Sequence, residues 1–280
     1  MTNSLTISNL YLPDTNMDRT PFSAITDSIY QEHNHYSVTL PADWLQGRTA
    51  YGGLSAALCL QATLRSLEDL PPLRSAQFCF VGPATGKLSI SVDVLRKGKS
   101  TTLVGCDLTG DSRLAVRSTL CFGGGRASSH DHQSFVMPKV AGPEECPGYY
   151  VWPDRPNFMS HFDGRLAAGA RPRTLGAKPE MTVWLRHHDA GDDASLVRLL
   201  ALADALPPPS LVLSKEFIPI STMTWSIDML DDKPFTSTGW WLVQATANTS
   251  REGYSAQETV IWSPDGKPVL VARQNVAIFG

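Results

Sequence analysis

The sequence lacks the charge excess and the long apolar run that mark several large classes of protein. Its 280 residues carry a formal net charge of −3, which gives no electrostatic basis for binding nucleic acid or an anionic membrane. No run of about twenty apolar residues occurs, so we expect no membrane span. The first residues lack a charged segment followed by an apolar one, so we also expect no secretory signal.

Cysteine and histidine are sparse and unsuitably spaced for a disulfide framework or a metal site. The five cysteines are odd in number, and most lie in apolar patterns typical of reduced core residues. No Cys-x-x-Cys pair occurs, and we interpret the histidines, including His161 and His187, as surface residues. There is no Gly-x-Ser-x-Gly nucleophile motif. We therefore predict a cytoplasmic protein without a bound metal.

The sequence does contain an internal repeat of turn signals. The matching positions are Gly86 and Gly239, Gly98 and Gly253, and Phe122-Gly123 and Phe279-Gly280, at offsets of 153, 155 and 157. A nearly constant offset across several turns is typical of a duplicated unit.

Each half is predicted to contain one helix and a set of strands. In the first half the strands are 34–40, 75–82, 87–96, 101–109 and 113–122, and the helix is 54–62. In the second half they are 180–187, 221–230, 240–249, 255–263 and 268–279, and the helix is 194–206. The first helix is small and apolar on nearly all sides, which indicates a helix enclosed by a sheet.

This pattern predicts an α+β protein with a double hotdog fold, in which each of two tandem repeats wraps an antiparallel sheet around a central helix. The predicted boundaries are 1–125 for the first repeat, 126–163 for a linker with little regular structure, and 164–280 for the second repeat. Two unrelated α+β domains are the alternative, which the shared offsets disfavour.

Asp204 and Gln274 each break the pattern of their own element. Gln274 is the polar residue on a strand face that is otherwise apolar from 270 to 278, and a buried amide without partners costs about 1 to 3 kcal/mol. Asp204 continues an apolar helical stripe into the last turn, where burial and the helix dipole both raise a carboxyl pKa. Structural interpretations also exist: Gln274 bonding loop backbone, and Asp204 capping the proline turn that follows.

Thr222 and Thr224 are the third element of a candidate site. In a regular strand they share a polar face with Ser226 and Asp228, and such a face is commonly the solvated side of a sheet. A carboxylate, an amide and a hydroxyl together can orient and deprotonate one water molecule. No member makes that case alone.

Gly52 and Gly53 directly precede the first helix. No lysine follows in the position that a phosphate-binding loop requires. Consecutive glycines permit close approach of a ligand to a helix N-terminus, where free N–H groups can polarise a carbonyl. We predict an oxyanion site here or at the equivalent segment of the second half.

In order and spacing, these segments resemble the acyl-CoA thioesterase II family, whose members are double-hotdog hydrolases. The matching segments are 47–53, 95–100, 202–208, 222–227 and 271–274. The resemblance implies that Asp204, Gln274 and a threonine activate water against a thioester. The local pattern Thr-x-Thr-x-Ser favours Thr222, whereas counting back from Pro234 favours Thr224.

The resemblance implies hydrolysis of an acyl-CoA, or of an acyl-carrier thioester, to a free acid and a thiol. Coenzyme A enters as part of the substrate, and no other cofactor is expected. Arg96, with neighbouring lysines, is a candidate contact for its phosphates, although such turn residues also serve solubility alone. The long linker and three tryptophans near the inferred pocket, Trp225, Trp240 and Trp241, point to a specialised substrate in lipid metabolism or a biosynthetic pathway.

Two other functions fit the same fold. An enoyl-thioester hydratase or dehydratase is one, and it needs a histidine beside a carboxylate in the pocket. An acyl-binding protein without turnover is the other. Open sheet edges predict a homo-oligomer, a dimer or larger.

Overall fold

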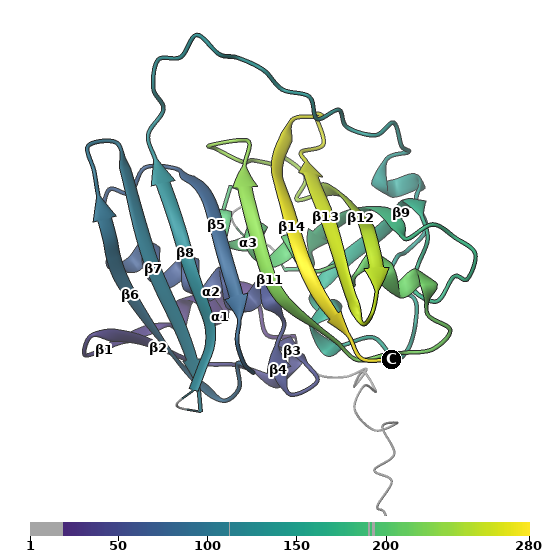
Figure 1. Ribbon diagram of the computed structural model, residues 1–280, viewed down its shortest axis with the longest axis horizontal. Coiled ribbons are helices and arrows are strands. Elements are labelled where there is room, and N and C mark those ends of the chain that lie inside the picture. Colours follow the sequence, from purple (N-terminus) through teal and green to yellow (C-terminus); the bar gives the residue numbers. More distant parts are fainter. Residues whose placement is uncertain (1–18, 112, 190, 192–193) are drawn as a thin grey trace, which may run out of the picture.

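The computed structural model describes residues 19–280 except 112, 190, 192 and 193. One antiparallel sheet of 12 strands forms the body of the molecule (Figure 1). In the first half of the chain its strands are β1 (Tyr30–Glu32), β2 (His35–Thr39), β5 (Leu73–Phe80), β6 (Lys87–Lys97), β7 (Thr101–Gly110) and β8 (Arg113–Gly123). In the second half they are β9 (Phe162–Gly169), β10 (Glu180–His187), β11 (Ile220–Met229), β12 (Trp241–Arg251), β13 (Tyr254–Trp262) and β14 (Pro268–Ile278). A small separate ribbon pairs β3 (Leu45–Gln46) with β4 (Thr49–Ala50).

The strand order confirms the predicted duplication. It runs β1-β2-β6-β7-β8-β5 through the first half and β11-β14-β13-β12-β10-β9 through the second. The second series, read backwards, repeats the first strand for strand, and the two series join where β5 pairs with β11. Gly86 and Gly239, which the sequence pairs, both have positive φ, at 67° and 75°, a conformation that glycine adopts without strain. The protein therefore has the double hotdog fold.

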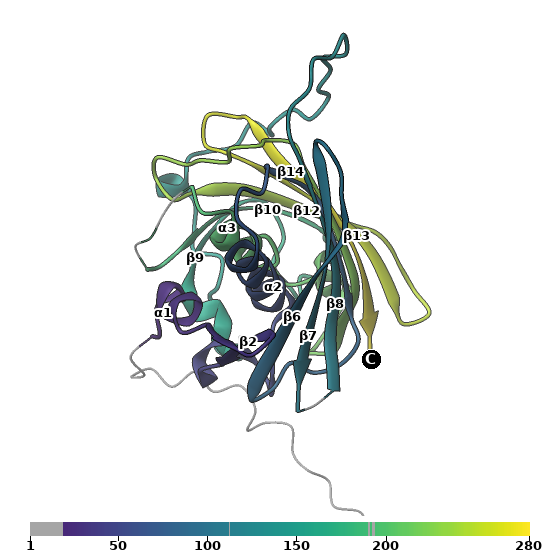
Figure 2. The ribbon, with the colours of Figure 1, turned by 90° about the vertical axis from the view of Figure 1, so that its left-hand side faces the viewer.

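Two central helices occupy the concave side of the curved sheet (Figure 2). They are α2 (Gly52–Ser66) and α3 (Leu196–Ala203), and they pack against each other. Residues 54 to 60 of α2 are all buried, as expected for an enclosed helix. The second helix is shorter than predicted, beginning after the cap Ser195, whose side chain accepts from Arg198 N–H, and ending before Asp204. A short helix, α1 (Phe22–Asp27), was not predicted.

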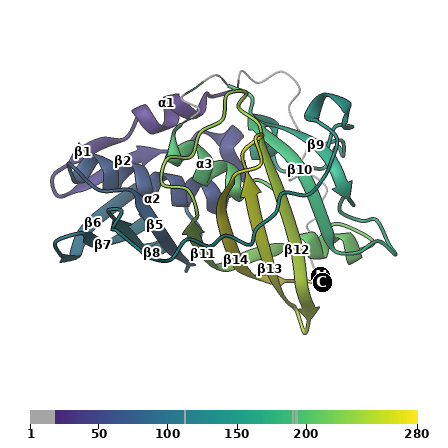
Figure 3. The same ribbon diagram turned by 90° about the horizontal axis from the view of Figure 1, so that it is seen from above.

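The predicted linker contains two short 3₁₀ turns, Pro143–Glu145 and Asn157–His161, and its last two residues already belong to β9. It is otherwise irregular. It leaves β8 and crosses to the β9 end of the sheet (Figures 1 and 3). Its side chains cover the outer face of the second repeat, where a second apolar cluster joins Phe135, Met137, Val140, Cys146, Trp184, Trp240, Leu242, Val260 and Trp262. The Trp184 indole N–H donates to the Ala141 carbonyl at 2.9 Å, so tertiary packing holds the linker in place.

The two edges of the sheet differ from each other, since the β9 edge is covered and the β1 edge is only partly filled. Residues 147–149 run along β9, where Leu166 N–H donates to the Pro147 carbonyl at 2.8 Å and Gly148 bridges to Arg165. At the other edge β1 has only three residues. Because β2 pairs only with residues 87–90 of β6, residues 91–97 have no partner on that side among the described strands. Part of this edge is therefore open to pairing, and the homo-oligomer stays a prediction. Within the described part of the chain, no helix is long and apolar enough to cross a membrane.

Candidate active site

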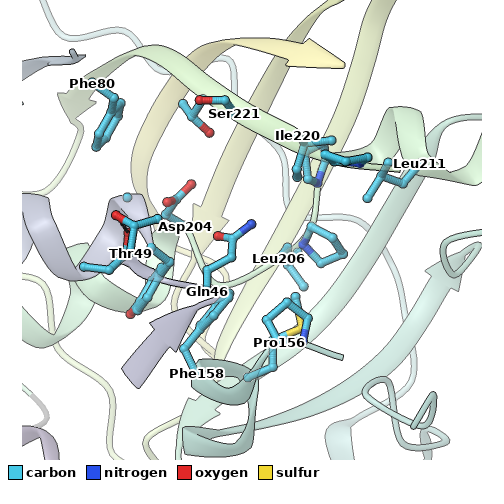
Figure 4. A pocket seen from close by; sticks show the side chains of 18 of the residues that line it. Gln46, Thr49, Phe80, Pro156, Phe158, Asp204, Leu206, Leu211, Ile220 and Ser221 are labelled. Atoms are coloured by element: carbon cyan, nitrogen blue, oxygen red, sulfur yellow. Dashed lines mark hydrogen bonds between the residues drawn. The ribbon is translucent and has the colours of Figure 1, made fainter. Parts of the chain in front are cut away.

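A cavity of about 430 Å³ lies where the two repeats meet, between the start of α2 and the end of α3 (Figure 4). Asp204, Gln274 and Thr222 all line it, although they come from three separate elements. Aromatic and proline side chains from distant segments complete its wall, among them Tyr51, Phe80, Trp152, Pro156, Phe158, Pro207, Pro208 and Phe217.

Asp204 caps the C-terminus of α3, and its half-buried carboxylate lies at the N-terminus of α2. It accepts a hydrogen bond from Gln274 Nε2 at 2.5 Å and another from the backbone N–H of Gly53. Burial raises the Asp204 pKa to about 6, and these two hydrogen bonds oppose the rise by favouring the carboxylate. The sequence predicts the direction of this shift. It misses the α2 terminus, whose dipole favours the negative charge that the end of α3 disfavours.

Gly52 and Gly53 allow α2 to begin against Asp204. A Cβ at Gly52 would lie 2.7 Å from Asp204 Oδ2, and one at Gly53 would lie 2.6 Å from the Ala201 carbonyl oxygen. The sequence predicts that the two glycines allow a ligand to approach α2 closely. In the structure they allow the Asp204 carboxylate to do so. Gly53 N–H faces Asp204 and favours its carboxylate form, whereas Gly52 lines the cavity. The equivalent segment before α3 includes residues 190, 192 and 193, which lie outside the described residues, so the alternative oxyanion segment stays a prediction.

Gln274 projects from the inner face of β14 and connects Asp204 to a second glutamine. Its Oε1 accepts from Nε2 of Gln257, which lies directly opposite on β13 and is 5% exposed. Neither structural interpretation drawn from the sequence describes these contacts, since the Gln274 amide bonds side chains and the Asp204 carboxylate turns toward α2. Sequence reasoning missed Gln257, although the β13–β14 hairpin register places a second inward-facing amide beside Gln274.

A β-bulge separates the two candidate threonines. Thr222 pairs with Val276 and Thr224 with Asn275, so Met223 is the extra residue in β11. A bulge interrupts the alternation of side chains along a strand, and the prediction that both threonines share a face is wrong. Thr222 lines the cavity, whereas Thr224 is exposed and borders a shallow depression outside it.

None of the three tryptophans predicted near the pocket lines the cavity, although Trp225 is the cross-strand partner of Gln274. Trp225 packs in the core with its ring 5.6 Å from that of Phe78. Trp240 belongs to the outer cluster under the linker, and Trp241 to the main core. Trp152, from the linker, is the tryptophan that lines the cavity. No local signal in the sequence indicates this, because only tertiary packing brings the linker to the site.

The structure does not bring Arg96 to the cavity. Arg96 is exposed near the end of β6 and pairs with Leu103, which in turn faces Cys121 of β8. The cavity lies toward the other end of β8, where Val116 pairs with Phe80. The site therefore gives no support to Arg96 as a contact for the substrate.

Two histidines expected at the surface are buried. The His161 ring stacks on Trp44 at 4.0 Å, its Nε2 lies 3.1 Å from Asp43 Oδ2, and the side chain of His187 is 5% exposed. Burial lowers the pKa of both rings. No histidine is among the described residues that line the cavity. Throughout the described part of the chain, no group of three or more His, Cys, Asp or Glu side chains is placed to hold a metal ion.

Comparisons with known proteins agree with this geometry. A family model described as the acyl-CoA thioesterase N-terminal domain matches residues 40–123, and one described as the C-terminal domain matches residues 143–278. No curated protein matches the chain.

Solved structures share the fold at low sequence identity. A conserved protein of unknown function with a hot dog fold from Alicyclobacillus acidocaldarius is similar at 24% identity and a TM-score of 0.83, covering 94% of this chain and 99% of that one. An acyl-CoA thioesterase II, TesB2, from Mycobacterium marinum is similar at 17% identity and a TM-score of 0.73, covering 91% and 97%.

Proposed function

Because the chain belongs to the acyl-CoA thioesterase family, we propose that it hydrolyses an acyl-CoA thioester with Asp204 as the general base. The observation that carries this proposal is the Asp204 carboxylate itself, which lines the cavity and is bonded by Gln274 and by Gly53 N–H. With a pKa of about 6, this group is ionised at neutral pH and basic enough to accept a proton from water.

In the proposed reaction, Asp204 and Thr222 orient a water molecule beside the thioester carbonyl carbon. Water forms the new C–O bond as its proton passes to Asp204. The first turn of α2 leaves N–H groups without intrahelical partners, and the Gly52 N–H is the one we assign to the developing oxyanion. Collapse of the tetrahedral intermediate breaks the C–S bond, and the thiolate takes the proton from Asp204. The products are a free acid and coenzyme A.

The substrate carries the only cofactor that this reaction needs, because coenzyme A is its leaving group. The aromatic and proline side chains of the cavity wall, Trp152 and Phe158 among them, support an acyl group more specialised than a plain fatty chain. We place the enzyme in the cytoplasm, in lipid metabolism or a biosynthetic pathway.

Thiol release from a panel of acyl-CoAs of varied length and branching tests the proposal. Release of free thiol from at least one member is the expected result. A folded protein that binds acyl-CoAs and releases no thiol would instead support the acyl-binding alternative. A carrier-protein thioester belongs in the same panel, since the chemistry at the carbonyl is identical.

The geometry of the cavity does not favour the hydratase alternative. Such an enzyme needs a histidine beside a carboxylate at the substrate, and His161 with Asp43 is a pair of that kind. Neither residue lines the cavity, and His161 is buried against Trp44. The pair therefore has no access to a thioester bound beside Asp204.

Replacing each threonine by valine distinguishes the two candidate hydroxyls. We expect Thr222→Val to lower kcat by about tenfold or more, because one hydrogen bond to the attacking water is lost. Thr224→Val serves as the matched control and should leave kcat within about twofold, since an exposed surface substitution has little effect. Steady-state kinetics on one acyl-CoA decides between them, and the reverse ranking would assign the role to Thr224.

The pH dependence of the reaction should follow the ionisation of Asp204. Only the carboxylate accepts a proton, so kcat/KM should rise with pH through about pH 6 and level off above it. Stability should run the other way. Because the folded-state pKa lies above the ordinary value of 3.8, a destabilising contribution is present above pH 6 and is lost as the pH falls toward 4. An acid limb near the ordinary value would show that a different group is the base.

A further inference from the structure

Gln257 is a buried amide that is linked through Gln274 to the Asp204 carboxylate. It lies on the inner face of β13, and its Nε2 donates to Gln274 Oε1. Its own Oε1 is buried without a hydrogen-bond partner among the described residues. A half-satisfied buried amide costs free energy that an apolar side chain would not. Such a cost is expected where a residue serves the site and not the packing.

The direction of the hydrogen bonds along this chain follows from chemistry. An ionised carboxylate only accepts hydrogen bonds, so Gln274 must present its NH₂ group to Asp204. The carbonyl oxygen of Gln274 must then face Gln257, which has to supply an NH₂ group in turn. Without that donor, rotation of the Gln274 amide by half a turn would place an oxygen against the carboxylate.

We propose that Gln257 is a positioning residue, which holds the Gln274 amide in the one orientation that donates to the Asp204 carboxylate. This inference rests on the proposed function of the same site. Gln257 itself does not line the cavity, so it acts through Gln274 and does not touch the substrate.

Few other ionisable groups pack against this carboxyl. Tyr51 at the start of α2 and Tyr150 from the linker hold the end of α3, donating to the carbonyls of Ala201 and Ala205 at 3.1 and 3.0 Å. Burial raises the pKa of both phenols well above their usual value, so they stay neutral. Among the described residues, the charged side chains that line the cavity besides Asp204 are Asp154, Arg173 and Glu216, of which the first two form an ion pair at 2.8 Å.

The first test replaces the donor by an apolar side chain of similar size. For Gln257→Leu we expect kcat to fall about tenfold, with KM within about twofold, because one hydrogen bond to the charged base is weakened. The acid limb of the kcat/KM profile should also move to higher pH, since the lost bond favours the carboxylate. Gln244→Leu is the matched control, because Gln244 on β12 is a half-buried amide that donates to Thr182, away from the cavity.

The second variant, Gln257→Glu, gives a readout that a packing defect does not. The introduced carboxylic acid can donate to Gln274 when protonated, but only accepts when ionised. We expect activity near that of the wild type at low pH and a new loss of activity as the pH rises. If Gln257→Leu does not fold, the loss of activity of Gln257→Glu at high pH tests the proposal by itself. A Gln257→Glu protein whose activity does not fall at high pH would overturn the proposal.

Two results separate this inference from the proposed reaction. Wild-type kcat and an unmoved acid limb in Gln257→Leu would overturn the role of Gln257 in an active thioesterase. If the wild type releases no thiol from any acyl-CoA, NMR titration of the Asp204 carboxyl remains, with Asp204→Asn to assign the resonance. A higher Asp204 pKa in Gln257→Leu would then support positioning although the proposed function had failed, and an unchanged pKa would reject it.

Discussion

Asp204→Asn is expected to lower kcat for acyl-CoA hydrolysis by about 10²–10⁴-fold, the range that a general base contributes. The amide keeps nearly the same shape as the carboxylate and still accepts from Gly53 N–H. It cannot accept a proton from water at any pH. Substrate binding should change little, because in the proposed reaction the carboxylate contacts the attacking water and not the body of the acyl-CoA. The loss should therefore fall on kcat and leave KM within about threefold.

Folding of the Asp204→Asn variant is the necessary control. Burial disfavours the ionised carboxyl in the folded state, so removing the charge should leave the protein at least as stable as the wild type near neutral pH. Thermal unfolding measures this directly. Asp228→Asn, on the exposed side of β11, should leave both kcat and Tm unchanged. Wild-type turnover in a folded Asp204→Asn protein would reject Asp204 as the base.

Gly53→Ala is expected to damage both stability and activity, although alanine ordinarily favours a helix over glycine by about 1 kcal/mol. The new Cβ would lie 2.6 Å from the Ala201 carbonyl oxygen, 2.6 Å from Tyr51 Cε2 and 2.9 Å from Asp204 Cβ. Backbone and ring atoms cannot move aside as a flexible side chain end can, so α2 and α3 must separate. Such overpacking costs about 1–3 kcal/mol.

The same separation should lengthen the hydrogen bond from Gly53 N–H to Asp204 and lower kcat by about tenfold or more. Chemical denaturation and steady-state kinetics measure the two effects. Gly124→Ala is the matched control, because a Cβ there meets no atom within 4 Å. A Gly53→Ala protein as stable and as active as the wild type would show that the contact between the two helices does not hold the carboxyl in place.

Several features of the site were readable from the residues alone. Asp204 and Gln274 stood out because each is polar within an apolar periodic pattern, and the structure places both at one cavity, in direct hydrogen-bond contact. The duplication was readable because turns demand particular residues at fixed positions, as the positive φ of Gly86 and Gly239 shows. Each of these signals depends only on residues that are close in the sequence, so it can be recognised without the tertiary structure.

Other features depended on contacts between distant segments. A one-residue bulge at Met223 chose Thr222 over Thr224 for the cavity, and a strand's own alternation does not reveal where its neighbours force an extra residue. The burial of His161 arises from packing against Trp44, more than a hundred positions away.

The sequence by itself determined the double hotdog architecture and two of the three proposed site residues, because periodicity and turn chemistry act over a few neighbouring positions. Tertiary structure alone decided which hydroxyl faces the cavity, that Gly53 donates to Asp204, that Gln257 supports Gln274, and that linker residues such as Trp152 wall the cavity. Each of these is a contact between elements far apart in the chain, and its geometry exists only once the two repeats have closed on each other.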